Sequence, residues 1–553
     1  MPEYLSPGVY VEEVDTGNKP IEGVATSTVG FLGVAERGPL EATLVTSFSE
    51  YSRSFGKYVD NRYLGRGVEG FFQNGGKRCF IARVARSDAV EATRANANNQ
   101  FTLSAIGPGT WPNNRLAFKV SAAGQDLLNP NLFKLTLMYW DSSVSGLPAP
   151  GAVIDPTDPQ TTTNPNRREP TIIETYDNLS SDPLASNFFE RQINGNSVLV
   201  TIQRTGQPVA RPTNQPAAAQ PPAPQPGQPP APAPPTPLPA EVFLANGTNG
   251  ADPALRPIDF LGDPNALPGN RHGLLALEEV DEIAILCCPD ESAFPSDIPG
   301  ALIDQCERLK DRFAILQSAQ GSFRPNELRP SVVSKYGGFY YPWIKVPDRL
   351  TGVPVDIPPG GHIAGIYARS DIERGVHKAP ANEVIRGLYL DPMDPAAGLT
   401  VQISKGQQDI LNPKGVNALR NFPGRGNLVW GARTTTLDPD WKYINVRRLF
   451  IFVEESIDEA TQWVVFEPND EPLWARVRRS VSDFLTRLWM DGMLQGRTKE
   501  EAYFVKCDRT TMTQADIDNG KLIMLIGIAP VKPAEFVIFR IGQWTGGSDV
   551  TEG

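Results

Sequence analysis

The stretch VRRLFIFVEESIDEATQWV, residues 446–464, repeats apolar residues every three or four positions and places charged residues between them. This period predicts an amphipathic helix. The same repeat returns in NDEPLWARVRRSVSDFLTRL, residues 469–488, where an Asn-Asp pair and Pro472 mark the start of a second helix. Gly492 or Gly496 can end that helix. The two patterns predict a compact helical module in the last quarter of the chain.

Short strands are predicted after these helices. A strand is expected at 503–507 and a turn-rich helix at 513–519. Two apolar runs follow, at 522–528 and 536–541, and prolines separate them. We expect these two runs to be strands of one sheet.

Length and composition restrict the class of protein. The chain has 553 residues, which predicts several domains, and 40% of them are hydrophobic, enough for ordinary cores. Its 52 basic and 63 acidic residues give a net charge of -11, which argues against nucleic acid as the partner. The first ten residues do not have a signal-peptide pattern, and no eighteen apolar residues run uninterrupted. We therefore expect a cytoplasmic protein with no membrane insertion.

Cysteine and histidine give no pattern typical of a metal or cofactor site. The five cysteines are an odd number without CxxC spacing, and Cys287 and Cys288 lie inside an apolar run. Buried free thiols are expected. No two of the three histidines have a ligand-like spacing. We expect no metal and no cofactor.

The first twenty residues contain one short strand with no neighbour in sequence. In it, Val9, Val11 and Val14 alternate with Tyr10 and Glu12. A single strand leaves its backbone groups unpaired and cannot be stable alone. We expect an arm that adds to a sheet elsewhere, including one on another subunit. A disordered terminus is the alternative.

An α/β core is predicted in two parts, 24–88 and 256–429. The first part reads strand, helix, strand, and the second has nearly all-apolar strands, which are typical of a parallel sheet covered on both faces. Its glycine-rich loops contain neither a P-loop nor a complete GxGxxG, so they are interpreted as turns. Four aromatic residues fit core packing better than a carbohydrate platform. They are Phe339, Tyr340, Tyr341 and Trp343.

Residues 89–255 interrupt this core. Short β-like runs among Asn, Pro, Thr and Gly predict a small all-β domain inserted into the chain. Within it, fourteen of the 32 residues at 208–239 are proline, which predicts a solvated linker or loop, with a PxxP-type docking ligand as the alternative. The expected fold class is multidomain α/β (α+β) with a β-rich insertion. The predicted domain organisation also includes the arm at 1–23 and a C-terminal domain at 430–553.

Groups that could perform catalysis are scattered. Asp371, Glu373 and Arg374 lie near His377 and resemble a general base with its orienting acid, but surface charge at a helix is the better interpretation. The motifs GxSxG, HExxH and SxxK are absent. We expect no catalytic residues and no enzyme.

Several segments resemble contractile tail sheath proteins, the family that forms the sheaths of contractile-tailed bacteriophages, R-type bacteriocins and extracellular contractile injection systems. The C-terminal segments are WGARTTTLDPDWKYINVRRLFIFVEESI (430–457), WVVFEPNDEPLWARVRRSV (463–481), FVKCDRTTMT (504–513) and IGIAPVKPAEFVIFRIGQ (526–543). Upstream blocks follow in the family's order, among them PGVYVEE, TVGFLGVAERGP, ILCCPD, YYPWIKV and PPGGHIAGIYAR. The family usually has glycine at the position of Pro112, which puts that local turn in doubt.

The resemblance implies a structural subunit. Sheath proteins stack as six-fold rings around an inner tube, and they contract to drive the tube through a target envelope. The implied partners are further copies of the chain, the inner tube protein, baseplate and terminal cap proteins, and paralogous sheath subunits. The resemblance does not distinguish whether the particle is a phage tail, a bacteriocin or an injection system. A secreted carbohydrate-binding or hydrolytic protein with a Pro-rich linker is the alternative from another class.

The resemblance also implies which residues join subunits. The arm at Val9 to Val14 and the C-terminal strand are expected to join the C-terminal sheets of neighbours, with 89–255 facing outward. The strand residues are Phe536, Val537, Ile538, Phe539 and Ile541. For tube contact we expect four arginines of the second helix, whose positive charge differs from the acidic chain, with a solvated face as the alternative. They are Arg476, Arg478, Arg479 and Arg487.

Overall fold

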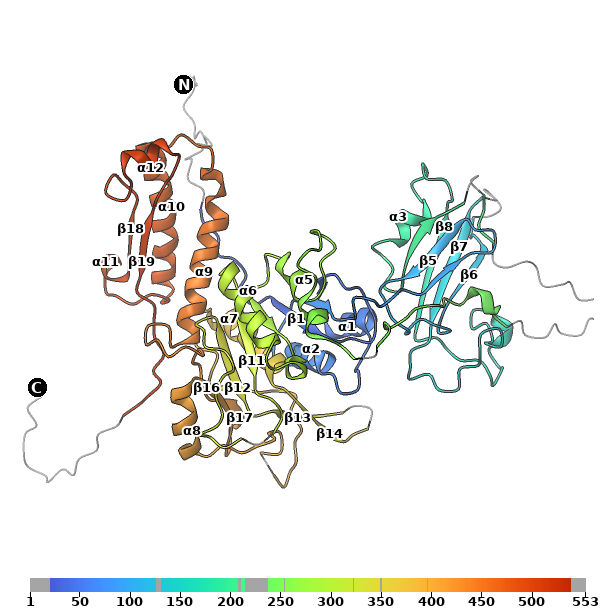
Figure 1. The fold of residues 1–553 in the computed structure, drawn as a ribbon, viewed down its shortest axis with the longest axis horizontal. Helices are drawn as coiled ribbons and strands as arrows, with labels where there is room; N and C mark the ends of the chain where they lie inside the picture. The colour runs from blue at the N-terminus through green and yellow to red at the C-terminus, as the bar shows by residue number, and fades with distance from the viewer. Residues whose placement is uncertain are drawn as a thin grey trace, which may run out of the picture. The chain divides into compact units, whose positions relative to one another are not determined.

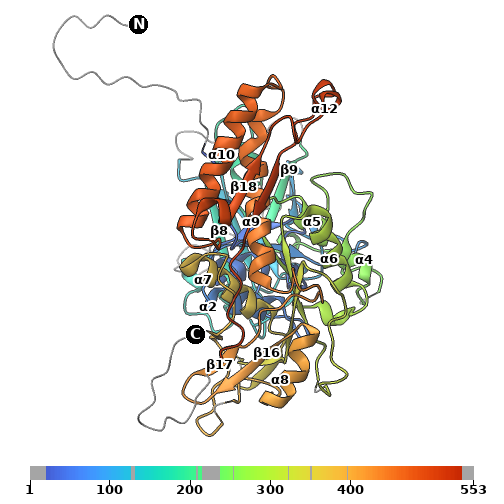
Figure 2. The same ribbon diagram turned by 90° about the vertical axis from the view of Figure 1, so that its left-hand side faces the viewer.

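The computed structural model describes residues 20–125, 131–206, 210–213, 237–252, 254–321, 323–348, 351–394 and 396–538. These residues fall into two compact units (Figures 1 and 2). The C-terminal unit contains the described residues of 1–24, 374–379 and 438–553, and the larger unit contains those of 25–373 and 380–437.

A nine-stranded sheet organises the larger unit, in the order β15-β17-β16-β12-β11-β10-β1-β3-β2. Six neighbouring strands are parallel: β16 (Val416–Phe422), β12 (Gly337–Tyr341), β11 (Phe313–Gln317), β10 (Ile285–Cys287), β1 (Val29–Gly33) and β3 (Cys79–Arg83). The remaining strands pair antiparallel: β2 (Thr43–Val45), β17 (Gly426–Val429) and β15 (Glu383–Val384). All residues of β1, β10, β11 and β12 are buried, which confirms the predicted parallel sheet.

Helices cover both faces of this sheet. A Cβ on Gly337 of β12 would lie 2.6 Å from Ile303 Cδ1 in α6 (Ile298–Leu309). Tyr340, three residues along the same strand, points the opposite way, and its hydroxyl lies 2.7 Å from that of Tyr367 in α7 (Gly360–Arg374). Because side chains alternate along a strand, α6 and α7 lie on opposite faces.

Further short elements complete this part of the unit. They are α1 (Phe48–Phe55), α4 (Pro257–Leu261), α5 (Leu274–Glu278), α8 (Lys405–Leu411) and the hairpin of β13 (Ile344–Pro347) with β14 (Pro354–Ile357). The predicted helix at SFSEYSRSFG is confirmed as α1, whose N-cap Ser47 accepts a hydrogen bond from Glu50 N at 3.1 Å. The four aromatic residues at 339–343 are buried, as predicted.

Residues 93–204 form two antiparallel sheets of three strands. One contains β4 (Thr93–Ala95), β5 (Phe101–Ala105) and β9 (Val200–Arg204), and the other β6 (Leu116–Ala122), β7 (Phe133–Tyr139) and β8 (Ile172–Leu179). They share one hydrophobic core with the short helix α3 (Phe189–Ile193). Most of the proline-rich segment lies outside the described residues.

The C-terminal unit matches the helix pattern of the sequence closely. Helix α9 spans Ile444–Thr461 and α10 spans Glu471–Met490. Asp470 caps α10 by accepting a hydrogen bond from Leu473 N at 2.9 Å, and Gly492 adopts a φ of 76° just after its end. Two short helices, α11 (Lys499–Ala502) and α12 (Gln514–Asp518), accompany the strands β18 (Tyr503–Lys506) and β19 (Leu525–Ile528).

One strand prediction is confirmed only in part. The run at 522–528 contains β19, and β19 pairs with β18. Phe536–Ile538 forms no strand in the described part of the chain, and residues 539–541 lie outside it. All five cysteines are buried and free, as predicted. Among the helices of the described residues, none combines the length and the apolar character that crossing a membrane requires.

Helix α2 (Leu64–Gln73) is missing from the sequence prediction because its three glycines disfavour a helix. The structure explains two of these glycines, Gly67 and Gly70, by close packing against α7. A Cβ on Gly361 would lie 2.2 Å from Gly67 O, and one on Gly70 would lie 2.2 Å from the ring of His362. Burial lowers the pKa of His362 to about 4, so this ring is neutral where the helices meet.

Gly361→Ala is therefore expected to destabilise the larger unit, by about 1–3 kcal/mol, because the added methyl group meets backbone on α2. The matched control is Gly300→Ala in α6, where nothing lies within 4 Å of the added carbon. That variant is expected to be neutral or to gain up to about 1 kcal/mol. Urea unfolding of both variants checks the difference, and equal stability would contradict the packing argument.

Candidate inter-subunit surface

The strands β18 and β19 form a two-stranded antiparallel hairpin, with Tyr503 opposite Ile528 and Lys506 opposite Leu525. One face packs on α10. The Tyr503 hydroxyl lies 2.6 Å from Thr486 Oγ1 and donates to Ser482 O at 3.1 Å. The register places Val505, Ile526 and Ile528 on this same face, where they join the core of the unit.

The opposite face of the hairpin exposes two apolar side chains beside Lys506. The side chains of Phe504 and Leu525 are 47% and 53% exposed. A Cβ on Gly527 would lie 2.2 Å from Phe504 Cε1, so the phenyl ring lies across the backbone of β19. The alternation of 503–506 is visible in the sequence, but only the register with β19 shows which residues share this outer face.

Each strand of the hairpin has one partner strand in the residues that the structure describes. The outer edges of β18 and β19 therefore present backbone N–H and C=O groups without a ladder. A two-stranded sheet is marginally stable, and an open edge accepts a further strand. The hairpin thus has the geometry of a strand acceptor.

The C-terminal run leaves the unit from an anchored point. Asn445 Nδ2 donates to Val531 O at 3.0 Å, and Glu535 Oε2 accepts from the Tyr443 hydroxyl at 3.0 Å. The next three residues, Phe536–Ile538, are 70–80% exposed apolar residues. The predicted arm residues Phe539 and Ile541 lie outside the described residues.

The N-terminal segment is also anchored on the C-terminal unit. Ile21 is buried in its core, and Arg487 of α10 donates to Ile21 O. Val24 N donates to Ser456 Oγ of α9 at 3.1 Å. The predicted arm residues Val9, Tyr10, Val11, Glu12 and Val14 precede this anchor and lie outside the described residues. Sequence reasoning missed this role of Arg487, which has no signature in the helix pattern.

The four candidate arginines of α10 are all exposed but do not form one patch. At about 100° of rotation per residue, Arg476, Arg479 and Arg487 lie within about 80° of one another around the axis of α10. Arg478 lies on the opposite side of the helix. Arg476 pairs with Glu467 at 3.4 Å and lies over the Trp463 ring.

Arg478 lies toward the hairpin. The pKa of Asp508, just after β18, is lowered mainly by hydrogen bonds from Thr510 and additionally by the charge of Arg478. Arg479 makes no hydrogen bond or ion pair with the part of the chain that the structure covers. In that same part, histidine, cysteine and carboxylate side chains form no cluster of three that could hold a metal ion.

Comparison with protein families gives two adjoining matches. The phage tail sheath protein central domain matches residues 268–435, and the phage tail sheath C-terminal domain matches residues 436–543. The boundary between the two matches lies close to Leu437, where the larger unit ends.

Curated relatives agree with these matches. The tail sheath protein of Vibrio phage KVP40 is 27% identical over 218 residues, covering 39% of this chain and 30% of that protein. The tail sheath protein of Enterobacteria phage T4 is 26% identical over 250 residues, covering 44% of this chain and 35% of that protein. The chain thus matches about a third of the length of these phage relatives.

Solved structures match over nearly the whole chain. The anti-feeding prophage helical sheath in its contracted state is 25% identical, covers 98% of this chain and 99% of its own, and gives a TM-score of 0.55. The sheath complex of the extracellular contractile injection system PVC, also contracted, covers the same shares at 21% identity with a TM-score of 0.55.

Arg487→Ala is expected to release the N-terminal segment from α10, because it removes the hydrogen bond to Ile21 O. The expected result is faster proteolytic cleavage near residues 20–25 and a loss of about 1–2 kcal/mol of stability. The matched control is Arg479→Ala on the same helix, which breaks no such bond. Limited proteolysis with mass spectrometry checks this, and identical cleavage in both variants would contradict the anchor.

Proposed function

We propose that this chain, which belongs to the contractile tail sheath protein family, is a structural subunit that polymerises into a sheath around an inner tube and contracts to drive that tube through a target envelope. The particle is a phage tail or a phage-like injection system. Stacked rings of six subunits are the arrangement proposed for the polymer. Further proposed partners are the inner tube, the baseplate and a terminal cap.

The open hairpin of β18 and β19 carries this proposal. It lies in the same unit as two anchored segments, of which one adjoins the predicted strand arm at 9–14 and the other the apolar run at 536–541. Strands donated by neighbouring copies would complete the hairpin and satisfy its edge groups. If one junction forms about six backbone hydrogen bonds at about 1 kcal/mol each, it contributes several kcal/mol. Identical head-to-tail contacts that do not close generate a helical polymer.

The proposed strand junctions between neighbouring copies are also compatible with contraction of the sheath. A strand junction resists loss of a subunit, while the residues beside it can rotate, so packing can change without disassembly. We propose that the energy is stored in the packing of the extended sheath and released when it contracts. No covalent chemistry is needed for this step.

The alternative of a carbohydrate-binding protein loses its main support. Its candidate platform, the aromatic residues at 339–343, is buried in the sheet of the larger unit. Buried rings cannot stack on a sugar in solvent.

Deletion of residues 1–19 is expected to abolish sleeve formation while the chain stays folded, because the anchor at Ile21 and Val24 is retained. Negative-stain electron microscopy of the full-length and shortened chains is the measurement. Hollow helical sleeves are expected from the full-length chain only. Sleeves from both would show that the N-terminal arm is dispensable, and dispersed particles from both, with tube protein added, would oppose a sheath.

Tube contact is proposed for the face of α10 that carries Arg476 and Arg479. Replacing both by Glu is expected to reduce copurification with the tube protein at low salt by at least tenfold. Arg478→Glu is the matched control, because Arg478 lies on the opposite side of the helix. Equal retention of the tube by all variants would contradict this proposal.

A further inference from the structure

The turn between α9 and α10 presents an aromatic side chain in an unfavourable setting. Phe466 has a φ of 69°, in the left-handed region that bulky residues avoid. Its side chain is fully exposed, and the preceding Val465 is also exposed. Neither the strain nor the exposure contributes to the packing of this unit. A binding role would account for both.

The turn is fixed and does not simply fray. Val465 N donates to Gln462 O at 3.2 Å, and Glu467 N donates to Val464 O at 3.1 Å. Arg476 of α10 pairs with Glu467 and lies over the ring of Trp463, which ties the turn to the helix. These contacts hold the backbone on both sides of Phe466, so its side chain is directed out of the turn before any partner arrives, which lowers the entropic cost of docking.

The sequence on both sides of Phe466 is acidic, although Glu467 and Glu471 already pair with Arg476 and Arg509. Residues 458–471 contain five acidic residues and no lysine or arginine. Two of them, Asp458 and Glu459, lie in the last turn of α9, where the helix dipole disfavours negative charge. The surface that fits this turn has an apolar centre and a positive rim.

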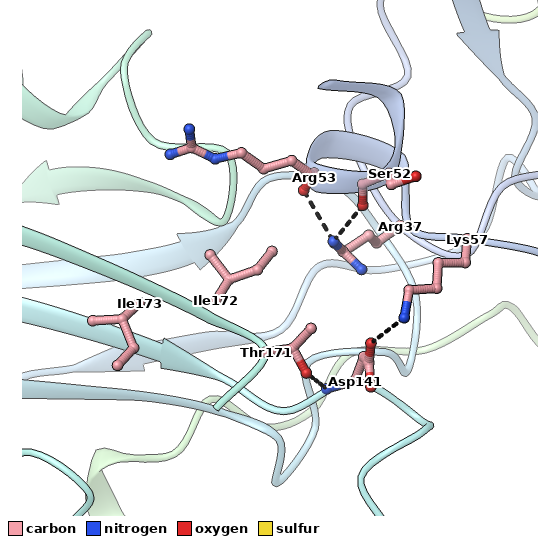
Figure 3. A pocket seen from close by; sticks show the side chains of 8 residues that line it. All are labelled: Arg37, Ser52, Arg53, Lys57, Asp141, Thr171, Ile172 and Ile173. Carbon is pink, nitrogen blue, oxygen red and sulfur yellow. Dashed lines mark hydrogen bonds and ion pairs between the residues drawn. The ribbon is translucent and has the colours of Figure 1, made fainter. Parts of the chain in front are cut away.

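The larger unit carries a surface of that kind (Figure 3). A cleft of about 360 Å³ lies between α1 and the start of β8, with Ile172 and Ile173 on its apolar side. The cations Arg53 and Lys57 are half-exposed at the cleft, and their nearest carboxylates, Glu174 and Asp141, lie 3.8 and 3.9 Å away. These separations are longer than hydrogen bonds, and both cations are half-exposed, so each can also reach the carboxylate of an incoming partner.

We propose that Phe466 of one copy inserts into the cleft at Arg53, Lys57 and Ile173 of a second copy, with the acidic turn pairing with the two cations. This inference rests on the proposed function, because it adds a copy-to-copy contact to the polymer. The contact joins two different surfaces, so it repeats from copy to copy without closing. Unlike the strand junctions, it uses side chains only and can form in one packing state and break in another.

Disulfide trapping tests the contact directly. Full-length Phe466→Cys is mixed with full-length Ile173→Cys under mild oxidation, and dimers are measured on non-reducing gels. The native cysteines of the described chain are buried, so the background is low. The matched control replaces Ile173→Cys by Leu184→Cys, a more exposed residue of the same unit. The mixture of two single variants reports contact between copies and not within one.

A charge exchange adds a second readout. Arg53→Glu with Lys57→Glu is expected to reduce the trapped dimer at least fivefold, and Asp458→Lys with Glu459→Lys in the other copy is expected to restore it. Phe466→Gly is expected to raise the Tm slightly by removing the strain, yet to raise the concentration needed for sleeves.

The results separate this inference from the proposed function. A trapped dimer well above the Leu184→Cys control supports the contact, whether or not sleeves are present. Sleeves without a trapped dimer overturn the contact and leave the sheath subunit standing. Absence of both sleeves and dimer counts against both.

Discussion

Backbone hydrogen bonding at the hairpin of β18 and β19 is the constraint on which the rest depends. Two strands satisfy only the groups that face each other, and α10 covers one face without supplying a ladder for the edges. An unpaired backbone group that leaves water costs free energy comparable to a lost hydrogen bond. The hairpin therefore gains most when further strands arrive, and the chain anchors two segments with strand patterns, at 9–14 and 536–541, on the same unit.

The larger unit shows the opposite design, because most strands of its nine-stranded sheet have a partner strand on both sides. In its parallel sheet, β3 follows on one side of β1, and β10, β11 and β12 follow on the other side. The strand order therefore reverses between β1 and β10, and such a switch point is where open α/β sheets commonly bind ligands. Here Asp290 fills that place: its carboxylate accepts from Val34 N at 2.8 Å and Tyr63 N at 2.7 Å. Burial raises the pKa of Asp290. A side-chain carboxylate thus lies at this place in the sheet, and its hydrogen bonds tie the ends of β1 and β10 to the start of α2.

Together, the closely packed larger unit and the open C-terminal hairpin fit a subunit that stays rigid while its proposed strand junctions to neighbouring copies change. The scaffold of the larger unit is fixed by glycine contacts such as Gly67 with Gly361, which leave no room for adjustment. The C-terminal unit instead exposes edges and apolar side chains, including Phe504 and Phe466. Contraction in the proposed sheath would then change how units pack and leave each unit intact.

The spacing of apolar residues predicted much of this fold. In α9, α10 and the parallel strands, the pattern of buried residues along each segment is visible in the sequence itself. Helix α10 was predicted down to its cap, since Asp470 and Pro472 carry local signals. Helix α2 was missed, because two of its glycines, Gly67 and Gly70, are explained by contacts with α7, nearly three hundred residues later in the chain. The run at 536–541 has a strand pattern but no strand partner among the described residues, because pattern alone does not say which chain supplies the partner. The Arg487 contact to Ile21 joins residues 466 positions apart and has no signal in the sequence.

Hydrogen–deuterium exchange on the full-length chain, before and after assembly, measures whether strands are added to the hairpin of β18 and β19. If they are, the backbone amides on its outer edges exchange rapidly in the dispersed chain and become strongly protected in sleeves, while the buried strands β1, β10 and β11 stay protected in both. Unchanged exchange at 503–506 and 525–528 on assembly would show that no strand is added to this hairpin.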